Sequence, residues 1–117
     1  MKLTQSDQTA IRSVIESQLL AFQQDNWEQA FAFASAGIQQ QFDTLENFQR
    51  MVKISYHPVY RPRSVIFESV TWLDSAPAQR VLVMSAHRHL FCAVYKMEQQ
   101  LDQTWRIAGC HLEPIRS

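Results

Sequence analysis

The sequence is short of glycine, of excess charge and of long apolar runs, and each shortage excludes a class of protein. With only two glycines, Gly37 and Gly109, a glycine-rich phosphate-binding loop cannot be built. Eleven basic residues balance eleven acidic ones, and a pI near 6.9 argues against a nucleic-acid-binding protein. The longest apolar run, Leu90–Tyr95, has six residues, far fewer than a membrane-spanning helix needs, so no membrane partner is expected.

Cysteine is also scarce. Cys92 and Cys110 are too few for a disulfide framework, and neither belongs to a CxxC pair. Both lie in apolar, strand-like segments, where a free thiol behaves as a small hydrophobic side chain, so we predict two reduced thiols. Residues 1–7 turn polar at once and lack the apolar stretch of a signal peptide, so the predicted location is the cytoplasm.

What is present is an ordinary globular composition, with 46% apolar residues in 117, which predicts one domain over residues 1–117 around one core. Apolar residues in the first half follow helical spacing, and capping residues divide that half into three helices. The first helix is predicted to start at Thr4 or Ser6 and the third at Thr44. The second is predicted to start after Asp25 and Asn26, which can cap it, and to end at Gly37.

Pro58 and Pro62 interrupt the chain in the middle, and residues 57–62 are predicted to be non-helical. Beyond them the apolar spacing changes to two, which is typical of strands. Helices followed by an antiparallel meander predict an α+β domain with the helices packed on the concave face of a curved sheet. The four predicted strands are residues 63–73, 79–87, 90–98 and 104–113, with a turn at residues 74–78.

The last predicted hairpin has a three-residue loop that requires a left-handed residue at Gln103, where glycine would be preferred. This loop pairs Glu98 with Arg106, which have opposite charges, and Tyr95 with Gly109. One face of the sheet then holds Tyr95, Trp105 and His111. The opposite face holds an apolar set that the helices cannot cover: Leu90, Cys92, Val94, Cys110 and Leu112.

Two pairs of segments carry a resemblance to a known family. They are Phe48–Val52 leading to Pro58–Val65, and Ala93–Glu98 leading to Trp105–Cys110. Together they resemble a bacterial domain-of-unknown-function family, number 4864, which is grouped with the nuclear transport factor 2-like (cystatin-like) fold.

The resemblance covers roughly residues 6–113 and implies a curved sheet wrapped around helices, with a cone-shaped cavity on the concave side. The wider fold often dimerises through its convex face, and it includes ligand carriers, isomerases, dehydratases and scaffolds. Gln103 departs from the family pattern, in which an Asp-Gly turn is typical. The resemblance carries over no catalytic residue.

Two groups of side chains are candidate ligand-binding residues. Tyr56, Tyr60 and Arg61 surround the prolines, where a guanidinium beside tyrosine hydroxyls suits a carboxylate or phosphate. The same residues also suit a rigid joint between the helices and the sheet, and the sequence favours that interpretation. Tyr95, Trp105 and His111 could line the cavity, with His111 as a general base. We predict no catalytic residue and no cofactor. We also predict no metal, because the pair His87 and His89 has no carboxylate at matching spacing.

The predicted function is therefore non-catalytic. We expect a dimer that binds a small organic or anionic ligand, or a protein partner, in its cone. The predicted dimer interface is the uncovered sheet face that holds Leu90, Cys92, Val94, Cys110 and Leu112. The alternative is a small lyase, isomerase or hydrolase that uses a histidine or tyrosine of the pocket as acid or base.

Overall fold

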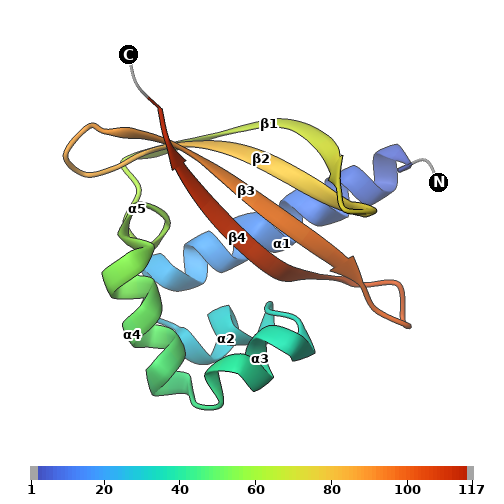
Figure 1. Cartoon of the computed structure of the whole chain (residues 1–117), viewed down its shortest axis with the longest axis horizontal. Coiled ribbons are helices and arrows are strands. Elements are labelled where there is room, and N and C mark those ends of the chain that lie inside the picture. Colours follow the sequence, from blue (N-terminus) through green and yellow to red (C-terminus); the bar gives the residue numbers. More distant parts are fainter. Residues whose placement is uncertain (1–2, 116–117) are drawn as a thin grey trace.

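The structure is a computed structural model and describes residues 3–115. Figure 1 shows the helices on one side of a curved sheet, in which the strands lie in the order β1-β2-β3-β4 and every neighbouring pair is antiparallel. The predicted α+β arrangement is confirmed at this level. The helices are α1 (Gln5–Gln23), α2 (Trp27–Ala32), α3 (Ala36–Phe42), α4 (Leu45–Ser55) and α5 (His57–Tyr60), and the strands are β1 (Ser64–Leu73), β2 (Ala76–Met84), β3 (Leu90–Gln99) and β4 (Trp105–Pro114).

The helix starts follow the capping residues read from the sequence. Thr4 caps α1 in a capping box, since its hydroxyl accepts from the Asp7 amide at 3.0 Å and the Asp7 carboxylate accepts from the Thr4 amide at 3.1 Å. Asn26 caps α2 and Thr44 caps α4, each through a side-chain oxygen that satisfies an amide of the first turn. These three predicted starts are confirmed.

The predicted end of the second helix at Gly37 is wrong. The helix α2 already ends at Ala32, and Gly37 lies inside the separate helix α3, which Ser35 caps. The interruption comes from β4, because the Ile107 amide donates to Phe33 and the Ile107 carbonyl accepts from the Ser35 amide, both at 2.8 Å. The chain thus leaves the helix to bond the edge of the sheet.

Two further boundaries differ from the sequence prediction. Residues 57–60 form the short helix α5, because Pro58 lies in its first turn, where the missing amide hydrogen costs no hydrogen bond. The strand β2 begins at Ala76, since the β1–β2 turn uses only Asp74 and Ser75, whose φ values of 50° and 66° suit a tight hairpin turn. The strand β2 also ends earlier than predicted, at Met84, because residues 85–89 form a turn in which Arg88 has a φ of 66°.

The register of the last hairpin is confirmed near the loop and wrong beyond it. Glu98 pairs with Arg106, and Gln103 is left-handed with φ 72°, both as predicted. The register then shifts, because Lys96 pairs with Gly109 while Met97 pairs with Ile107, which leaves Ala108 as an extra residue in a β-bulge. Tyr95 therefore pairs with Cys110 and not with Gly109.

One extra residue exchanges the two faces of the strand that follows it. Cys110 and Leu112, predicted on the outer face, lie opposite Tyr95 and Ala93 and pack against the core. His111, predicted on the helix side, lies opposite Val94 on the convex face. The prediction of these three orientations is wrong for this single reason.

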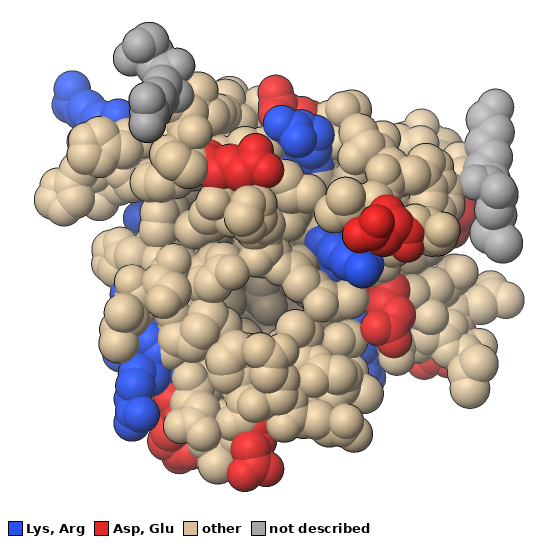
Figure 2. Space-filling view, in the orientation of Figure 1, with Lys and Arg blue, Asp and Glu red and all other residues tan. Residues whose placement is uncertain are grey.

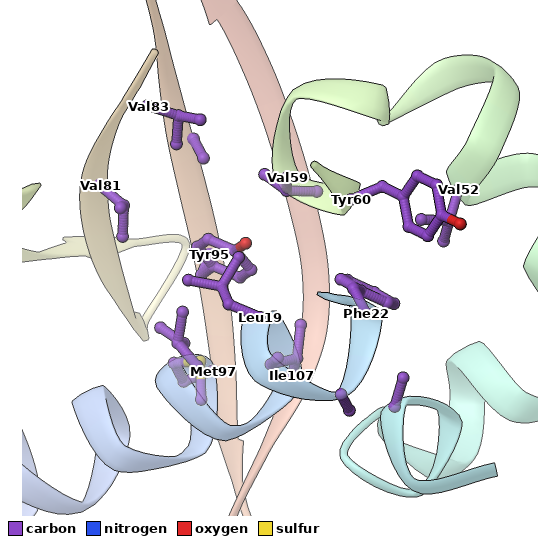
Figure 3. Close-up of a cluster of buried hydrophobic side chains, with 14 of the residues drawn as sticks. Leu19, Phe22, Val52, Val59, Tyr60, Val81, Val83, Tyr95, Met97 and Ile107 are labelled. Atoms are coloured by element: carbon purple, nitrogen blue, oxygen red, sulfur yellow. The ribbon is translucent and has the colours of Figure 1, made fainter. Parts of the chain in front are cut away.

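The core forms where α1 crosses the concave face of the sheet. Figure 3 shows Leu19 and Phe22 of α1 close to Tyr95, Met97 and Ile107, all of them buried. Burying a side chain of this size stabilises the folded state by about 1.5–3 kcal/mol relative to exposure, so this layer holds α1 against the sheet. Among residues 3–115, no helix has the length and apolar character to cross a membrane.

Candidate functional site

A cavity of about 450 Å³ lies between the sheet and the helices. Figure 2 shows a hollow near the middle of the face on which, in Figure 1, β4 lies opposite α2 and α3, and the atoms around it belong to uncharged residues. The lining residues come from α1, α3, α4, α5, β3 and β4 and the segment before α3. They are Gln18, Phe22, Ala34, Ile38, Gln41, Phe42, Phe48, Met51, Val52, Tyr56, Val59, Tyr95, Ile107, Gly109 and Cys110.

None of the lining residues within the described part of the chain carries a charge. Most of the wall is aliphatic or aromatic, and the polar groups are two glutamines, two tyrosines and one cysteine. Ligand sites commonly combine such an apolar wall with a few placed polar groups, and this volume lies within their usual range.

Tyr95 supplies the deepest polar group of the site. Its side chain is only 1% exposed, and among residues 3–115 its hydroxyl has no hydrogen-bond partner. Figure 3 shows the hydroxyl oxygen pointing from β3 toward the helical side, where the lining residues Val52 and Val59 lie. Burial raises the pKa of Tyr95 well above its ordinary value of 10.0, so the hydroxyl keeps its proton near neutral pH.

Cys110 and Tyr56 complete the polar side of the cavity. The Tyr56 hydroxyl donates to the Cys110 backbone carbonyl at 2.7 Å and thereby ties the end of α4 to the edge strand β4. Burial raises the pKa of the Cys110 thiol to about 12, although the neighbouring Tyr95 hydroxyl acts in the opposite direction. Burial also raises the pKa of Tyr56. All three side chains are therefore neutral near pH 7.

Gln18 is a lining residue that the sequence prediction missed. It lies on the buried stripe of α1 between Ile15 and Phe22, at helical spacings of three and four residues. Its amide nitrogen donates to the Ala30 carbonyl at 3.0 Å, and no residue in the described range donates to its amide oxygen. A glutamine inside an otherwise apolar stripe was the available sequence signal.

The helix α3 forms the least buried wall. None of its residues is fully buried, although Ile38 and Phe42 line the cavity. Gln39 helps to hold it, since its amide donates to the Phe31 and Ala34 carbonyls at 3.1 Å each. Asp43 ends the helix with φ 66°, in a tight turn closed by the Thr44 amide and the Phe42 carbonyl. This wall is therefore the natural route of entry into the cavity.

Tyr60 and Arg61, predicted as ligand-binding residues, lie outside the cavity. The Tyr60 hydroxyl donates to the Asp25 carboxylate at 2.6 Å, which lowers the pKa of Asp25 and raises that of Tyr60. The Arg61 guanidinium stacks 4.1 Å from the Tyr60 ring and donates to the Phe22 carbonyl at 2.6 Å and to both Asp25 oxygens at 3.1 Å. Arg61 thus binds a carbonyl at the end of α1, which supports the interpretation of these residues as a rigid joint.

Of the other predicted pocket residues, two line the cavity and two lie elsewhere. Tyr56 and Tyr95 line the cavity, whereas Trp105 is buried in the core and is not a lining residue. The His111 side chain is 73% exposed on the convex face, 3.7 Å from Glu113, so its predicted place in the cavity is wrong. No cluster of three or more metal-binding side chains occurs in the part of the chain that the structure describes.

Comparison with known proteins gives one match. A family model described as "Domain of unknown function (DUF4864)" matches residues 4–117, nearly the whole chain. The chain belongs to this family. No curated protein matches it, and no solved structure does.

Membership in the DUF4864 family is what the sequence resemblance predicted, and that part of the prediction is confirmed. The chemistry available in the cavity of this DUF4864 domain depends on its lining residues. Its titratable lining residues are Tyr56, Tyr95 and Cys110, and all three hold their protons near neutral pH. Such a site can exclude water and donate hydrogen bonds, and it offers no ionised group to a ligand.

Proposed function

We propose that this domain binds a small, uncharged and mostly apolar organic molecule in the cavity between the sheet and α1, α3 and α4. The observation that carries the proposal is the unpartnered hydroxyl of Tyr95 in the wall of a mostly apolar cavity of about 450 Å³. Buried polar groups without partners are rare in folded proteins and often mark functional positions. A cavity of this size, lined in this way, suits a drug-sized ligand.

The composition of the wall favours an uncharged ligand over the anionic one that the sequence suggested. Arg61 already binds Asp25 and the Phe22 carbonyl, and no lining residue in the described range is basic. A carboxylate or phosphate in this cavity would lose its hydration without gaining a counter-charge, which costs several kcal/mol. The proposal is therefore limited to neutral molecules.

The same wall favours binding over catalysis. A general base near neutral pH needs a pKa close to that pH, whereas the pKa of Cys110 is about 12 and that of Tyr95 lies well above 10.0. His111, the predicted base, lies on the opposite face of the sheet. Among the described lining residues, the alternative lyase, isomerase or hydrolase therefore has no general base for neutral pH.

We extend the proposal to the wider fold and to location. Helices first, then a four-strand meander that encloses a cavity on its concave side, support a nuclear transport factor 2-like domain. The two free cysteines suit the reducing cytoplasm.

A second copy of the chain is the partner we propose for the convex face. After the bulge, this face holds Leu90, Cys92 and Val94 of the predicted interface, joined by Leu82 and by Ile66, whose side chain is 58% exposed. Around them the pair Glu98–Arg106 and the residues Lys96 and Glu113 provide both signs of charge. A face with both signs of charge can complement itself across a two-fold axis.

Titration with the uncharged dye N-phenyl-1-naphthylamine, followed by its fluorescence, tests the ligand-binding proposal. We expect saturable binding of one dye per chain with a Kd on the order of 10–100 μM. Replacing Ile38 by Trp should fill the mouth of the cavity and weaken binding about tenfold or more, which is about 1.4 kcal/mol.

The matched control is Gln40→Trp, because Gln40 is exposed on the same helix and does not line the cavity. This control should bind the dye as the wild type does. Absence of saturable binding, or equal affinity in the Ile38→Trp and Gln40→Trp variants, would contradict the proposal.

A further inference from the structure

We propose that the ligand carries an uncharged oxygen acceptor, of the ketone, ester or amide class, and that the Tyr95 hydroxyl donates its hydrogen bond to that oxygen. This specificity rests on the proposed ligand-binding function and names the chemistry at the inner end of the same cavity. It makes Tyr95 the residue that distinguishes an oxygen-bearing ligand from a hydrocarbon of the same shape.

Among residues 3–115, the protein offers this hydroxyl no strong acceptor, and the polar group beside it is the Cys110 thiol. Tyr95 is 1% exposed, and in residues 3–115 no group forms a hydrogen bond with its hydroxyl. The neighbouring polar side chain is the Cys110 thiol, which burial keeps protonated and whose sulfur is a weak acceptor. Phenylalanine would fill the same space without leaving a buried O–H unsatisfied, so the hydroxyl is explained by a partner from outside the chain.

The other polar groups of the cavity leave this role to Tyr95. The Tyr56 hydroxyl already donates to the Cys110 carbonyl at 2.7 Å. One N–H of the Gln18 amide already donates to the Ala30 carbonyl at 3.0 Å, which leaves its second N–H and its acceptor oxygen. Gln41 lies exposed on α3, at the outer end of the cavity. Among residues 3–115, Tyr95 thus supplies the buried lining hydroxyl that has no partner within the protein.

The absence of basic side chains among the described lining residues favours a neutral ligand oxygen over a charged one. A carboxylate would also accept from Tyr95, but no basic side chain lines the cavity within the described chain. A single neutral donor does not compensate the lost hydration of a buried anion. A neutral carbonyl oxygen needs only one good donor, and the rest of the ligand can pack on the apolar wall.

Competition against N-phenyl-1-naphthylamine tests this specificity with three probes of similar shape. Benzophenone carries a ketone, diphenylmethane lacks it, and diphenylacetate carries a charge. We expect the wild type to bind benzophenone about tenfold more tightly than diphenylmethane, and diphenylacetate more weakly than either. In the Tyr95→Phe variant, benzophenone and diphenylmethane should bind equally, with diphenylmethane bound as in the wild type.

A matched control is Tyr60→Phe, which removes a hydroxyl that lies outside the cavity and is already bonded to Asp25 within the protein. It should lower the melting temperature and retain the preference for benzophenone. By contrast, Tyr95→Phe should retain or raise the melting temperature without ligand, because it removes an unsatisfied buried hydroxyl.

The outcomes separate this specificity from the function on which it rests. If the dye binds but the wild type shows no preference for benzophenone, or if Tyr95→Phe keeps that preference, the assignment of Tyr95 is overturned and ligand binding stands. The assignment of Tyr95 is also overturned if neither neutral probe displaces a bound dye, or if diphenylacetate binds more tightly than benzophenone. If the dye itself does not bind, the proposed function fails first.

Discussion

Tyr95 lies directly opposite Cys110 across the β3–β4 pair, on the concave face of the sheet. The bulge at Ala108 produces this pairing, and it brings a buried hydroxyl and a buried thiol together at the inner end of the cavity. Without the bulge, Gly109 would stand opposite Tyr95 and His111 would face the helices. One inserted residue thus shapes the chemistry of the site: the lining residues within positions 3–115 include a few neutral donors and no histidine.

Removing the Arg61 side chain should destabilise the fold. The Arg61→Ala variant loses the 2.6 Å bond to the Phe22 carbonyl and the stacking on Tyr60, and we expect about 1–2 kcal/mol less free energy of unfolding in urea titrations. Arg63→Ala is the matched control, because its side chain is exposed, and it should change stability by less than about 0.5 kcal/mol. If Arg61→Ala had normal stability but no longer bound the dye, Arg61 would instead belong to the ligand site.

Acid should weaken the interaction between Asp25 and Tyr60. The Tyr60 hydrogen bond holds the pKa of Asp25 below its ordinary value of 3.8 in the folded chain. The ionised carboxylate therefore stabilises the fold above pH 3.8, and this contribution is lost as the pH falls through the lower folded value.

The variant Asp25→Asn tests this dependence, since asparagine tolerates the φ of 53° at this position. Thermal unfolding should show the wild type more stable than Asp25→Asn near neutral pH, with the difference shrinking below pH 3.8. A difference that stays constant across this range would show that the carboxylate charge does not contribute.

Both thiols should be reduced and slow to react in the folded protein. Cys92 and Cys110 are free, and burial raises the pKa of each thiol, that of Cys110 to about 12. Because the thiolate is the reactive form, titration with a disulfide reagent near neutral pH should be slow for the native protein. After denaturation without reductant it should reveal two thiols per chain. Fewer than two would indicate a disulfide and contradict the structure.

Association through the convex face is testable at Val94, which pairs with His111 on that face. If two copies join there, Val94→Glu places two like charges near the centre of the interface and should split the dimer. Light scattering at micromolar concentration should give twice 13.6 kDa for the wild type and 13.6 kDa for the variant. A monomeric wild type would exclude the proposed dimer under these conditions, and a dimeric variant would place the interface elsewhere.

Local signals in the sequence predicted the parts of the fold that local interactions determine. The caps at Asn26 and Thr44, the left-handed Gln103 and the pairing of Glu98 with Arg106 each depend on residues close together in the chain. The split between α2 and α3 could not be read this way, because it depends on hydrogen bonds to Ile107, more than seventy residues away.

The candidate site was predicted only in part, for the same physical reason. Tyr56 and Tyr95 were identified as pocket residues. Gly109, the glycine next to the bulge at Ala108, was interpreted as the partner of Tyr95 and not as a sign of a bulge, so His111 was assigned to the wrong face. The helical wall was missed because apolar residues such as Met51 and Val52 look like ordinary core residues in a sequence. Whether such a residue faces a cavity depends on how the helices pack.

Nuclear Overhauser effects from bound N-phenyl-1-naphthylamine test most directly where the ligand binds. If the cavity is the ligand site, the dye protons should show contacts to the methyl groups of Ile38, Met51, Val52 and Val59, which line it. Contacts instead to Leu82 and Val94 on the convex face would contradict the account, because binding would then occur outside the cavity.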